Sequence, residues 1–179
     1  MLLGEDRLAL MRERAKRIGA GVKDGAPEEE FVNSITVVAS QVQNLQICAQ
    51  VGAHEVQVDE PVAGGGDGTA QSPVETLLAA LAACTEVNWV AYSSAFGLEL
   101  EKVDVTVEGT IDHRYLLSGA GSVPARLLAV TITSDVYTVA PKEKIERVHE
   151  KVQKFCPVAG SLHPSIQKDY TLSLHPPET

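Results

Sequence analysis

Residues 72–97, SPVETLLAALAACTEVNWVAYSSAFG, decide the fold. Pro73 suits the first position of a helix, Ser72 suits its N-cap, and Glu75 stands where a capping-box partner is expected. The stretch that follows, up to about Phe96, is rich in alanine and leucine and apolar on most faces. We therefore predict one long helix that is central and buried.

Segments with alternating apolar and polar residues flank this helix on both sides. In the predicted strand 98–111 the alternation is interrupted near Glu101 and Lys102, so we expect a shift of strand register there. Pro141 begins a second helix that runs to Phe155. The residue order predicts an α+β domain in which an antiparallel sheet covers helices. The predicted strands are a meander of two or three in residues 34–58, with turns at Gln43-Asn44 and Gly52-Ala53, and single strands in residues 98–111, 126–139 and 170–174.

The N-terminal segment differs from the rest of the chain in charge. Residues 6–23 place apolar side chains at helical spacing among arginines and lysines, which predicts an amphipathic helix. The first 23 residues carry a net charge of +3, whereas the remainder of the −9 chain carries −12. We predict a helix and linker over residues 1–32 and a domain over residues 33–179. The helix is expected to dock on the chain's own acidic domain or on a partner subunit, with an arm that binds nucleic acid or a membrane as the alternative.

Composition excludes several classes of protein. The chain has 179 residues, of which 44% are hydrophobic, as in an ordinary globular domain. Its net charge of −9 argues against a nucleic-acid partner. We expect no secretory signal at the start of the sequence, and the longest apolar stretch, Leu77–Cys84, is far short of the roughly 20 residues that span a membrane. Three cysteines are too few for a disulfide framework, which indicates free thiols and a cytoplasmic location.

Two kinds of ligand site are weakly supported. The segment GGGDGTAQS, residues 64–72, predicts a mobile loop before a helix, but it lacks the GK[ST] of a phosphate-binding loop. A zinc site from Cys48, His54, Cys84 and Cys156 is conceivable, yet no CxxC, HxH or HxxxH spacing is present. We therefore expect no bound cofactor or metal, and we assign Cys48 to packing.

Two cysteines could carry chemistry. Cys84 lies inside the predicted buried helix, where burial raises the pKa of a thiol, and Glu75 falls on the opposite helical face. Cys156 precedes Pro157 and so suits the N-cap of a new helical turn, where free N–H groups and the helix dipole favour a thiolate. His149 lies on nearly the same helical face as Cys156. It is either a base for that thiol or a surface histidine without a catalytic role. The pattern suggests a dithiol pair; a Cys-His hydrolase would need an oxyanion hole and an orienting residue that the sequence does not display.

Three segments together resemble the OsmC/Ohr family of cysteine-dependent hydroperoxide reductases. They are SPVETLLAALAAC (72–84), GLELEKVDVTVEG (97–109) and CPVAGSLH (156–163), and the similarity runs from about Val37 to the C-terminus. The resemblance implies an intertwined homodimer in which a wrapped antiparallel sheet surrounds long central helices, with two active sites at the subunit interface.

The resemblance also implies roles for the thiols. Cys84 would be the peroxidatic cysteine that attacks an organic hydroperoxide, Cys156 would resolve the sulfenic acid, and an external dithiol would reduce the disulfide. Where the family has a glutamate after the proline this chain has Val74, with Glu75 one residue later, and residues 44–46 lack the hairpin arginine. This implies a weakened peroxidase, unless Arg126, Arg114 or an arginine of the N-terminal helix reaches Cys84 from the partner subunit. The alternative is a weak or inactive dimer that senses redox state or binds a small apolar ligand.

Overall fold

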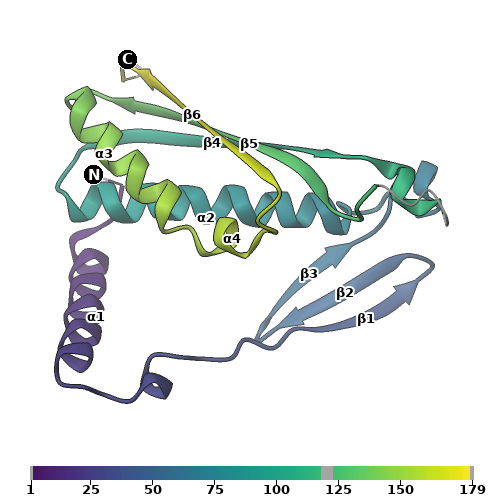
Figure 1. Cartoon of the computed structure of the whole chain (residues 1–179), viewed down its shortest axis with the longest axis horizontal. Helices are drawn as coiled ribbons and strands as arrows, with labels where there is room; N and C mark the ends of the chain where they lie inside the picture. Colours follow the sequence, from purple (N-terminus) through teal and green to yellow (C-terminus); the bar gives the residue numbers. More distant parts are fainter. Residues whose placement is uncertain (1, 118–122, 178–179) are drawn as a thin grey trace. The chain divides into compact units, whose positions relative to one another are not determined.

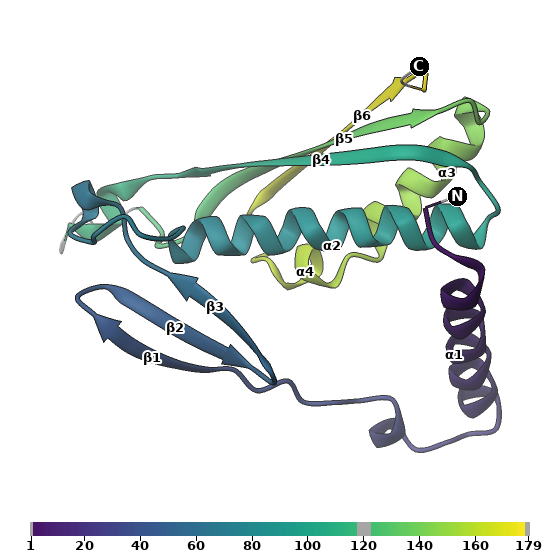
Figure 2. The same ribbon diagram turned by 180° about the vertical axis from the view of Figure 1, so that it is seen from behind.

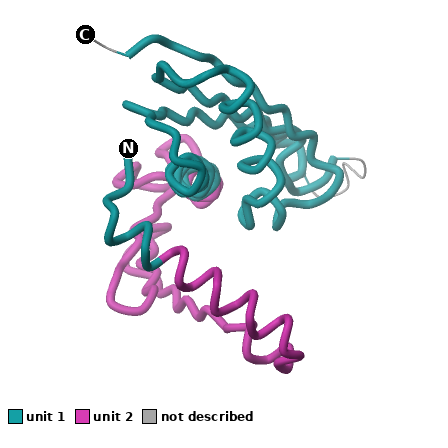
Figure 3. The backbone as a smooth tube through the Cα atoms, turned by 90° about the vertical axis from the view of Figure 1, so that its left-hand side faces the viewer, with its two compact units in different colours: residues 1–10, 78–179 teal, residues 11–77 magenta. Residues whose placement is uncertain are grey.

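The computed structural model describes residues 2–117 and 123–177 (Figure 1). The chain forms two compact units, residues 1–10 with 78–179 and residues 11–77 (Figure 3). The predicted boundary after residue 32 stays a prediction. Between the predicted strands 98–111 and 126–139, the chain forms the 3-10 turn η3 (His113–Leu116).

The first half of the chain forms a helix and a small sheet, as its patterns predict. Helix α1 (Glu5–Lys23) is followed by the 3-10 turn η1 (Glu28–Glu30). An antiparallel meander follows in the order β1-β2-β3, with turns at Asn44, whose φ is 46°, and at Gly52, whose φ is 61°. These positive φ angles suit asparagine and glycine. The strands are β1 (Val38–Gln43), β2 (Gln46–Val51) and β3 (His54–Val58).

The glycine loop that precedes the long helix is held by a buried carboxylate. Asp59 accepts hydrogen bonds from the N–H of Thr69 at 3.0 Å, the hydroxyl of Thr69 at 2.9 Å and the N–H of Asp67 at 3.2 Å. The Thr69 N–H bond is the main reason that the pKa of Asp59 is lowered. At Gly66 a Cβ atom would lie 1.9 Å from the Glu60 carbonyl oxygen. Side-chain hydrogen bonds and this close backbone approach therefore define the path of the loop, and its mobility stays a prediction.

Helix α2 (Pro73–Ala95) begins with the predicted capping box. The Ser72 N–H donates to Glu75 Oε2 at 2.7 Å, and the Glu75 N–H donates to Ser72 Oγ at 3.2 Å. The Ser72 N–H is also the main cause of the lowered pKa of Glu75. Glu75 therefore acts in helix capping, which satisfies N–H groups that have no partner inside the helix.

The capping role of Glu75 predicts a pH-dependent contribution to stability. Because the folded state lowers the pKa of this carboxyl below its ordinary 4.5, the stabilisation is complete above pH 4.5 and is lost as the pH falls through the folded-state pKa. Glu75→Gln should melt at a lower temperature than wild type at pH 7, and the difference should shrink below pH 4.5. Glu99→Gln, at an exposed site outside any cap, is the control. A difference that persists unchanged at pH 3 would contradict the capping role.

Within the single chain only one face of α2 is buried, so the prediction of a central and buried helix holds for that face alone. Leu81, Thr85 and Trp89 are buried, whereas Val87 is 65% exposed. By length and composition α2 is also apolar enough to cross a membrane, a property that core helices of soluble proteins share. Its buried face is that of a core helix, because the indole N–H of Trp89 donates to Ser134 Oγ on the neighbouring sheet at 2.9 Å.

The other unit contains a sheet of order β4-β5-β6. The β4–β5 pair is antiparallel, and its register shifts between Leu100 and Lys102, which confirms the predicted slip. Strand β6 is parallel to β5, because two helices connect them and return the chain to the same end of the sheet. The elements are β4 (Leu100–Ile111), β5 (Leu127–Thr138), α3 (Lys142–Lys154), α4 (Pro157–Ser161) and β6 (Gln167–His175).

Helices α2 and α3 lie on the same face of this sheet, and β4 and β5 extend along α2 (Figures 1 and 2). The shared core is built around Trp89, into which α3 inserts one apolar stripe at helical spacing. This core fixes the C-terminal end of α3 relative to α2, and thereby positions the segment that carries Cys156. Its buried members are Trp89, Leu98, Leu100, Val103, Val136, Ile145, Val148 and Val152.

Candidate active site

Cys84 occupies the middle of α2, is half-buried, and lies about one helical turn before the core residue Trp89. Burial is the main factor that raises the pKa of its thiol above the ordinary 9.0. The backbone N–H of Val158, from α4, acts in the opposite direction because it donates to the Cys84 sulfur. The thiol is therefore mostly protonated at neutral pH.

Cys156 is buried and caps α4, as the Cys-Pro dipeptide predicts. Its Sγ accepts a hydrogen bond from the Ala159 N–H at 3.4 Å. Because α4 has only five residues, its helix dipole is weak, and the Ala159 N–H is the hydrogen-bond donor that the structure places at the Cys156 sulfur. The junction before Cys156 is tied to α2, since Asn88 Nδ2 donates to the Phe155 carbonyl at 3.4 Å.

The fold brings the two cysteines together although they are far apart in the sequence. Cys156 interacts with Cys84 through a side-chain hydrogen bond and through charge, and both effects raise the pKa of Cys84. Two neighbouring thiols of this kind can exchange between dithiol and disulfide forms. The sequence suggested a pair, but only the packing of α4 against α2 brings the sulfurs into reach of each other. The roles of the two thiols remain predictions.

His149 is packed for structure and does not contact Cys156. Its ring stacks on Trp89 with 5.7 Å between centroids and an interplanar angle of 13°, and the Gln153 amide nitrogen lies 3.2 Å from both ring nitrogens. Burial is the main cause of the lowered pKa of His149, so the imidazole is neutral at pH 7. The pair that a Cys-His hydrolase needs is not assembled.

The described arginines and lysines that could activate the thiols do not contribute to the pKa of Cys84. Arg114 forms an ion pair with Asp112 and holds the pKa of that carboxyl at about 2. Arg126 has no side-chain hydrogen bond or ion pair with any other described residue. In residues 78–117 and 123–177, no arginine or lysine contributes to the pKa of Cys84. Lys151 and Lys154, which precede Cys156 in the last turn of α3, each place their Nζ 5.4 Å from the centroid of the Phe155 ring.

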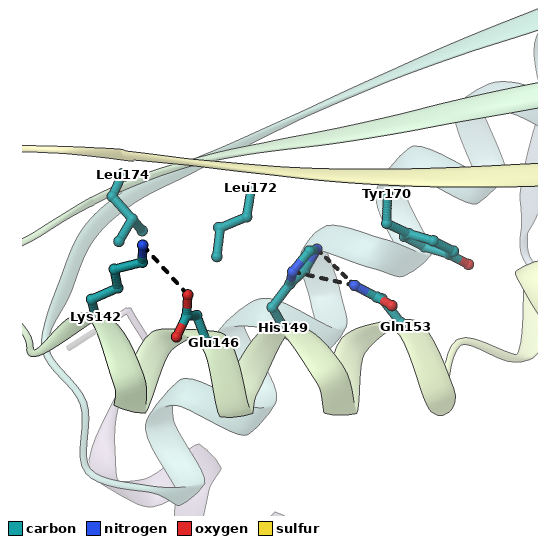
Figure 4. A pocket seen from close by; sticks show the side chains of 7 residues that line it. All are labelled: Lys142, Glu146, His149, Gln153, Tyr170, Leu172 and Leu174. Carbon is teal, nitrogen blue, oxygen red and sulfur yellow. Dashed lines mark hydrogen bonds and ion pairs between the residues drawn. The ribbon is translucent and has the colours of Figure 1, made fainter.

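A cavity of about 570 Å³ lies between α3 and β6. Figure 4 shows His149 and Gln153 pointing into it from α3, and Tyr170 facing them from β6. The Tyr170 ring meets the His149 ring nearly edge-on, with 6.5 Å between centroids. The sequence reasoning missed Tyr170; its place at the start of a predicted strand gave no sign of the site, because its neighbours come from another element.

No metal centre is evident in the part of the chain that the structure describes, where no group of three or more His, Cys, Asp or Glu side chains is placed to hold an ion. Cys48 is half-buried in β2, with Gln50 Nε2 4.0 Å from its sulfur. It belongs to the other unit and has no described thiol neighbour.

Comparisons with known proteins agree with this architecture. The family model described as "OsmC-like protein" matches residues 65–171. A putative osmotic stress induced and detoxification response protein from Psychrobacter arcticus has 21% identity and a TM-score of 0.65, with 80% of this chain and 98% of that chain covered. An OsmC-like protein from Mycoplasma pneumoniae has 16% identity and a TM-score of 0.67, with coverage of 79% and 97%.

A third similar structure is that of a protein named for peroxide resistance. It is an organic hydroperoxide resistance protein from Legionella pneumophila, with 19% identity, a TM-score of 0.61, and coverage of 79% of this chain and 98% of that one. No curated protein matches the chain. At these identities the structural likeness concerns the fold, whereas the family match covers more than half of the sequence, including both Cys84 and Cys156. The chain therefore belongs to the family of OsmC-like proteins.

Proposed function

We propose that the protein is a cysteine-dependent peroxidase that reduces organic hydroperoxides in a dithiol/disulfide cycle. The observation that carries the proposal is the interaction of the Cys84 and Cys156 side chains inside an OsmC-like fold. Members of this fold family include hydroperoxide resistance proteins, which points to a role in peroxide resistance.

The proposed cycle has three steps. The Cys84 thiolate attacks the distal oxygen of the hydroperoxide, so that the O–O bond breaks, an alcohol leaves and Cys84 becomes a sulfenic acid. Cys156 then displaces hydroxide from that sulfur, and a disulfide and water form. An external dithiol reduces the disulfide, and no bound cofactor takes part. Such a cycle suits a reducing, cytoplasmic compartment.

We also propose that the protein acts as a homodimer. One face of α2 is apolar and exposed in the single chain, and Ala80, Ala83 and Val87 recur on it at helical spacing. Monomeric proteins rarely leave such a stripe uncovered, and a second α2 would bury it. A partner subunit would also offer a place for the cation that the Cys84 thiolate lacks within residues 78–117 and 123–177.

A second candidate function is a weak or inactive dimer that senses redox state or binds a small apolar ligand. The raised pKa of Cys84 and the lack of a neighbouring described arginine favour it, because both reduce the thiolate that peroxide chemistry needs. The test of the first proposal separates the two.

Counting thiols tests the peroxidase proposal directly. Reduced protein is mixed with cumene hydroperoxide, hydrogen peroxide or buffer, denatured, and its free thiols are counted. We expect two of the three thiols to be lost with cumene hydroperoxide, with Cys48 retained. Cys156→Ser should instead give one dimedone adduct at Cys84, since no second thiol condenses with the sulfenic acid. Thiol counts equal to the buffer control would leave only the second candidate, and an adduct at Cys156 in Cys84→Ser would reverse the roles.

A further inference from the structure

Another cavity, of about 540 Å³, lies between the C-terminal half of α1 and residues 30–33. All of the residues that line it belong to the unit of residues 11–77, and they lie outside the family match at residues 65–171. We call it the α1 cavity. Its volume is in the range of small-molecule sites, and the proposed function gives it no part.

The sequence forms this cavity by folding the chain back on α1. The helix ends in a left-handed turn at Gly25, whose φ is 73°, and the Ala26 N–H donates to the Gly21 carbonyl at 2.9 Å. The chain then returns, so that the Phe31 ring lies against Gly21, where a Cβ atom would be only 3.1 Å from Phe31 Cζ. Glycine at this position therefore allows the aromatic ring to form one wall of the cavity.

The helical wall of the cavity carries two cations. Arg14, Arg17, Ile18 and Gly21 are spaced i, i+3, i+4 and i+7, so they share one face of α1. Neither guanidinium has a hydrogen bond or an ion pair with another residue in 2–117 or 123–177. A guanidinium binds a carboxylate through two parallel hydrogen bonds, and this pair is therefore suited to an anionic group.

The apolar part of the cavity is exposed. Phe31 is 39% exposed and Val32 is 65% exposed, and Ile18 on the helical wall is 42% exposed. Large apolar side chains that line one exposed cavity indicate a surface for an apolar group. The α1 cavity thus combines a cationic end with an apolar surface.

We propose that the α1 cavity binds a single fatty carboxylate. The carboxylate group lies between Arg14 and Arg17, and the hydrocarbon chain covers Ile18, Phe31 and Val32. Charge-assisted hydrogen bonds hold the head group, and burial of apolar surface holds the chain. The site is independent of Cys84 and Cys156, so it goes beyond the proposed function.

Acidic residues beside the cavity argue against a larger anionic partner. Glu28, Glu29 and Glu30 follow one another in η1, and Glu30 also lines the cavity. A nucleic acid or an anionic membrane presents many negative charges, which these carboxylates repel. A single carboxylate needs only the two arginines. The charges around the cavity therefore favour one small ligand.

Calorimetric titration of the full-length protein with monomeric decanoate tests the cationic end. Arg14→Gln/Arg17→Gln should weaken binding about tenfold or more, as expected for loss of hydrogen bonds between charged groups. Arg12→Gln/Lys16→Gln removes the same charge from α1 outside the cavity and should change the affinity less than about twofold. Equal affinities in the two double variants, or no binding by wild type, would overturn the proposal.

The same titration separates the contributions of head group and chain. Decan-1-ol, which lacks the charge, should bind about tenfold more weakly than decanoate. Phe31→Ala should weaken decanoate binding about tenfold, whereas Phe96→Ala, at a 54% exposed site outside the cavity, should not. Equal affinities for decanoate and decan-1-ol would contradict a role for the arginines, and equal effects of the two phenylalanine variants would contradict the apolar contact.

Methyl NMR locates the ligand without any variant. Decanoate should shift the methyl signals of Ile18 and Val32 and leave that of Val62, which is 74% exposed in the same unit, unchanged. Shifts at Val87 of α2 without shifts at Ile18 and Val32 would place the ligand elsewhere and refute the proposal. Sedimentation with phosphatidylglycerol vesicles tests the larger partner. Protein that sediments with the vesicles but does not bind decanoate would replace the proposed site by a membrane-binding surface.

Discussion

Replacing Cys84 with serine is expected to lower the rate of organic hydroperoxide consumption by on the order of 10³-fold or more. A serine hydroxyl does not ionise at neutral pH, so the group that attacks the O–O bond is lost, while the size of the side chain barely changes. The measurement is the loss of cumene hydroperoxide with dithiothreitol as reductant. Cys48→Ser is the matched control, because Cys48 lies in the other unit and should leave the rate unchanged.

The pH dependence of the same reaction tests the environment of Cys84. Because burial raises the pKa of this thiol, the rate should rise about tenfold per pH unit through the neutral range, in proportion to the thiolate fraction. A plateau at pH 7 would contradict this expectation. Such a plateau would require a positively charged side chain next to Cys84. Residues 78–117 and 123–177 place none there, so it would have to come from elsewhere, for example from an arginine of a partner subunit. Activity that survives in Cys84→Ser would exclude Cys84 as the peroxidatic residue.

Replacing Trp89 with alanine is expected to lower the free energy of unfolding by about 3–5 kcal/mol, the largest effect on stability. Trp89 is completely buried, lies in the core that α2, α3 and the sheet share, and stacks on His149. Trp89→Phe should cost about 1–3 kcal/mol, because the buried Ser134 hydroxyl loses its indole partner. Urea unfolding followed by far-ultraviolet circular dichroism at fixed protein concentration gives both values.

The control for this prediction is Val139→Ala. Val139 is 82% exposed between β5 and α3, and its loss should cost less than about 0.5 kcal/mol. Because Trp89 holds α3 in place, Trp89→Phe should also slow disulfide formation between Cys84 and Cys156. A Trp89→Ala variant as stable as Val139→Ala would show that the core does not depend on the indole.

Local sequence patterns determined most of the elements. The Ser72-Pro73-Glu75 box sets the start of α2, the Cys156-Pro157 dipeptide separates α4 from α3, and the broken alternation at Glu101-Lys102 marks the slip in β4. Each signal acts between residues close together in the chain, through capping, restricted dihedral angles or strand alternation. Such signals need no knowledge of the rest of the fold.

Tertiary structure alone decided what surrounds the thiols. The parallel pairing of β6 with β5, the stacking of His149 on Trp89 and the edge-on contact of Tyr170 with His149 all join residues from different elements. The sequence by itself placed Cys84 inside a long helix and Cys156 at the start of a short one. The three segments that resemble the family indicated that these two thiols form the pair. Their approach to each other depends on how α2, α3 and β6 pack, because burial and side-chain contact are set by long-range packing, which residue spacing along the chain does not encode.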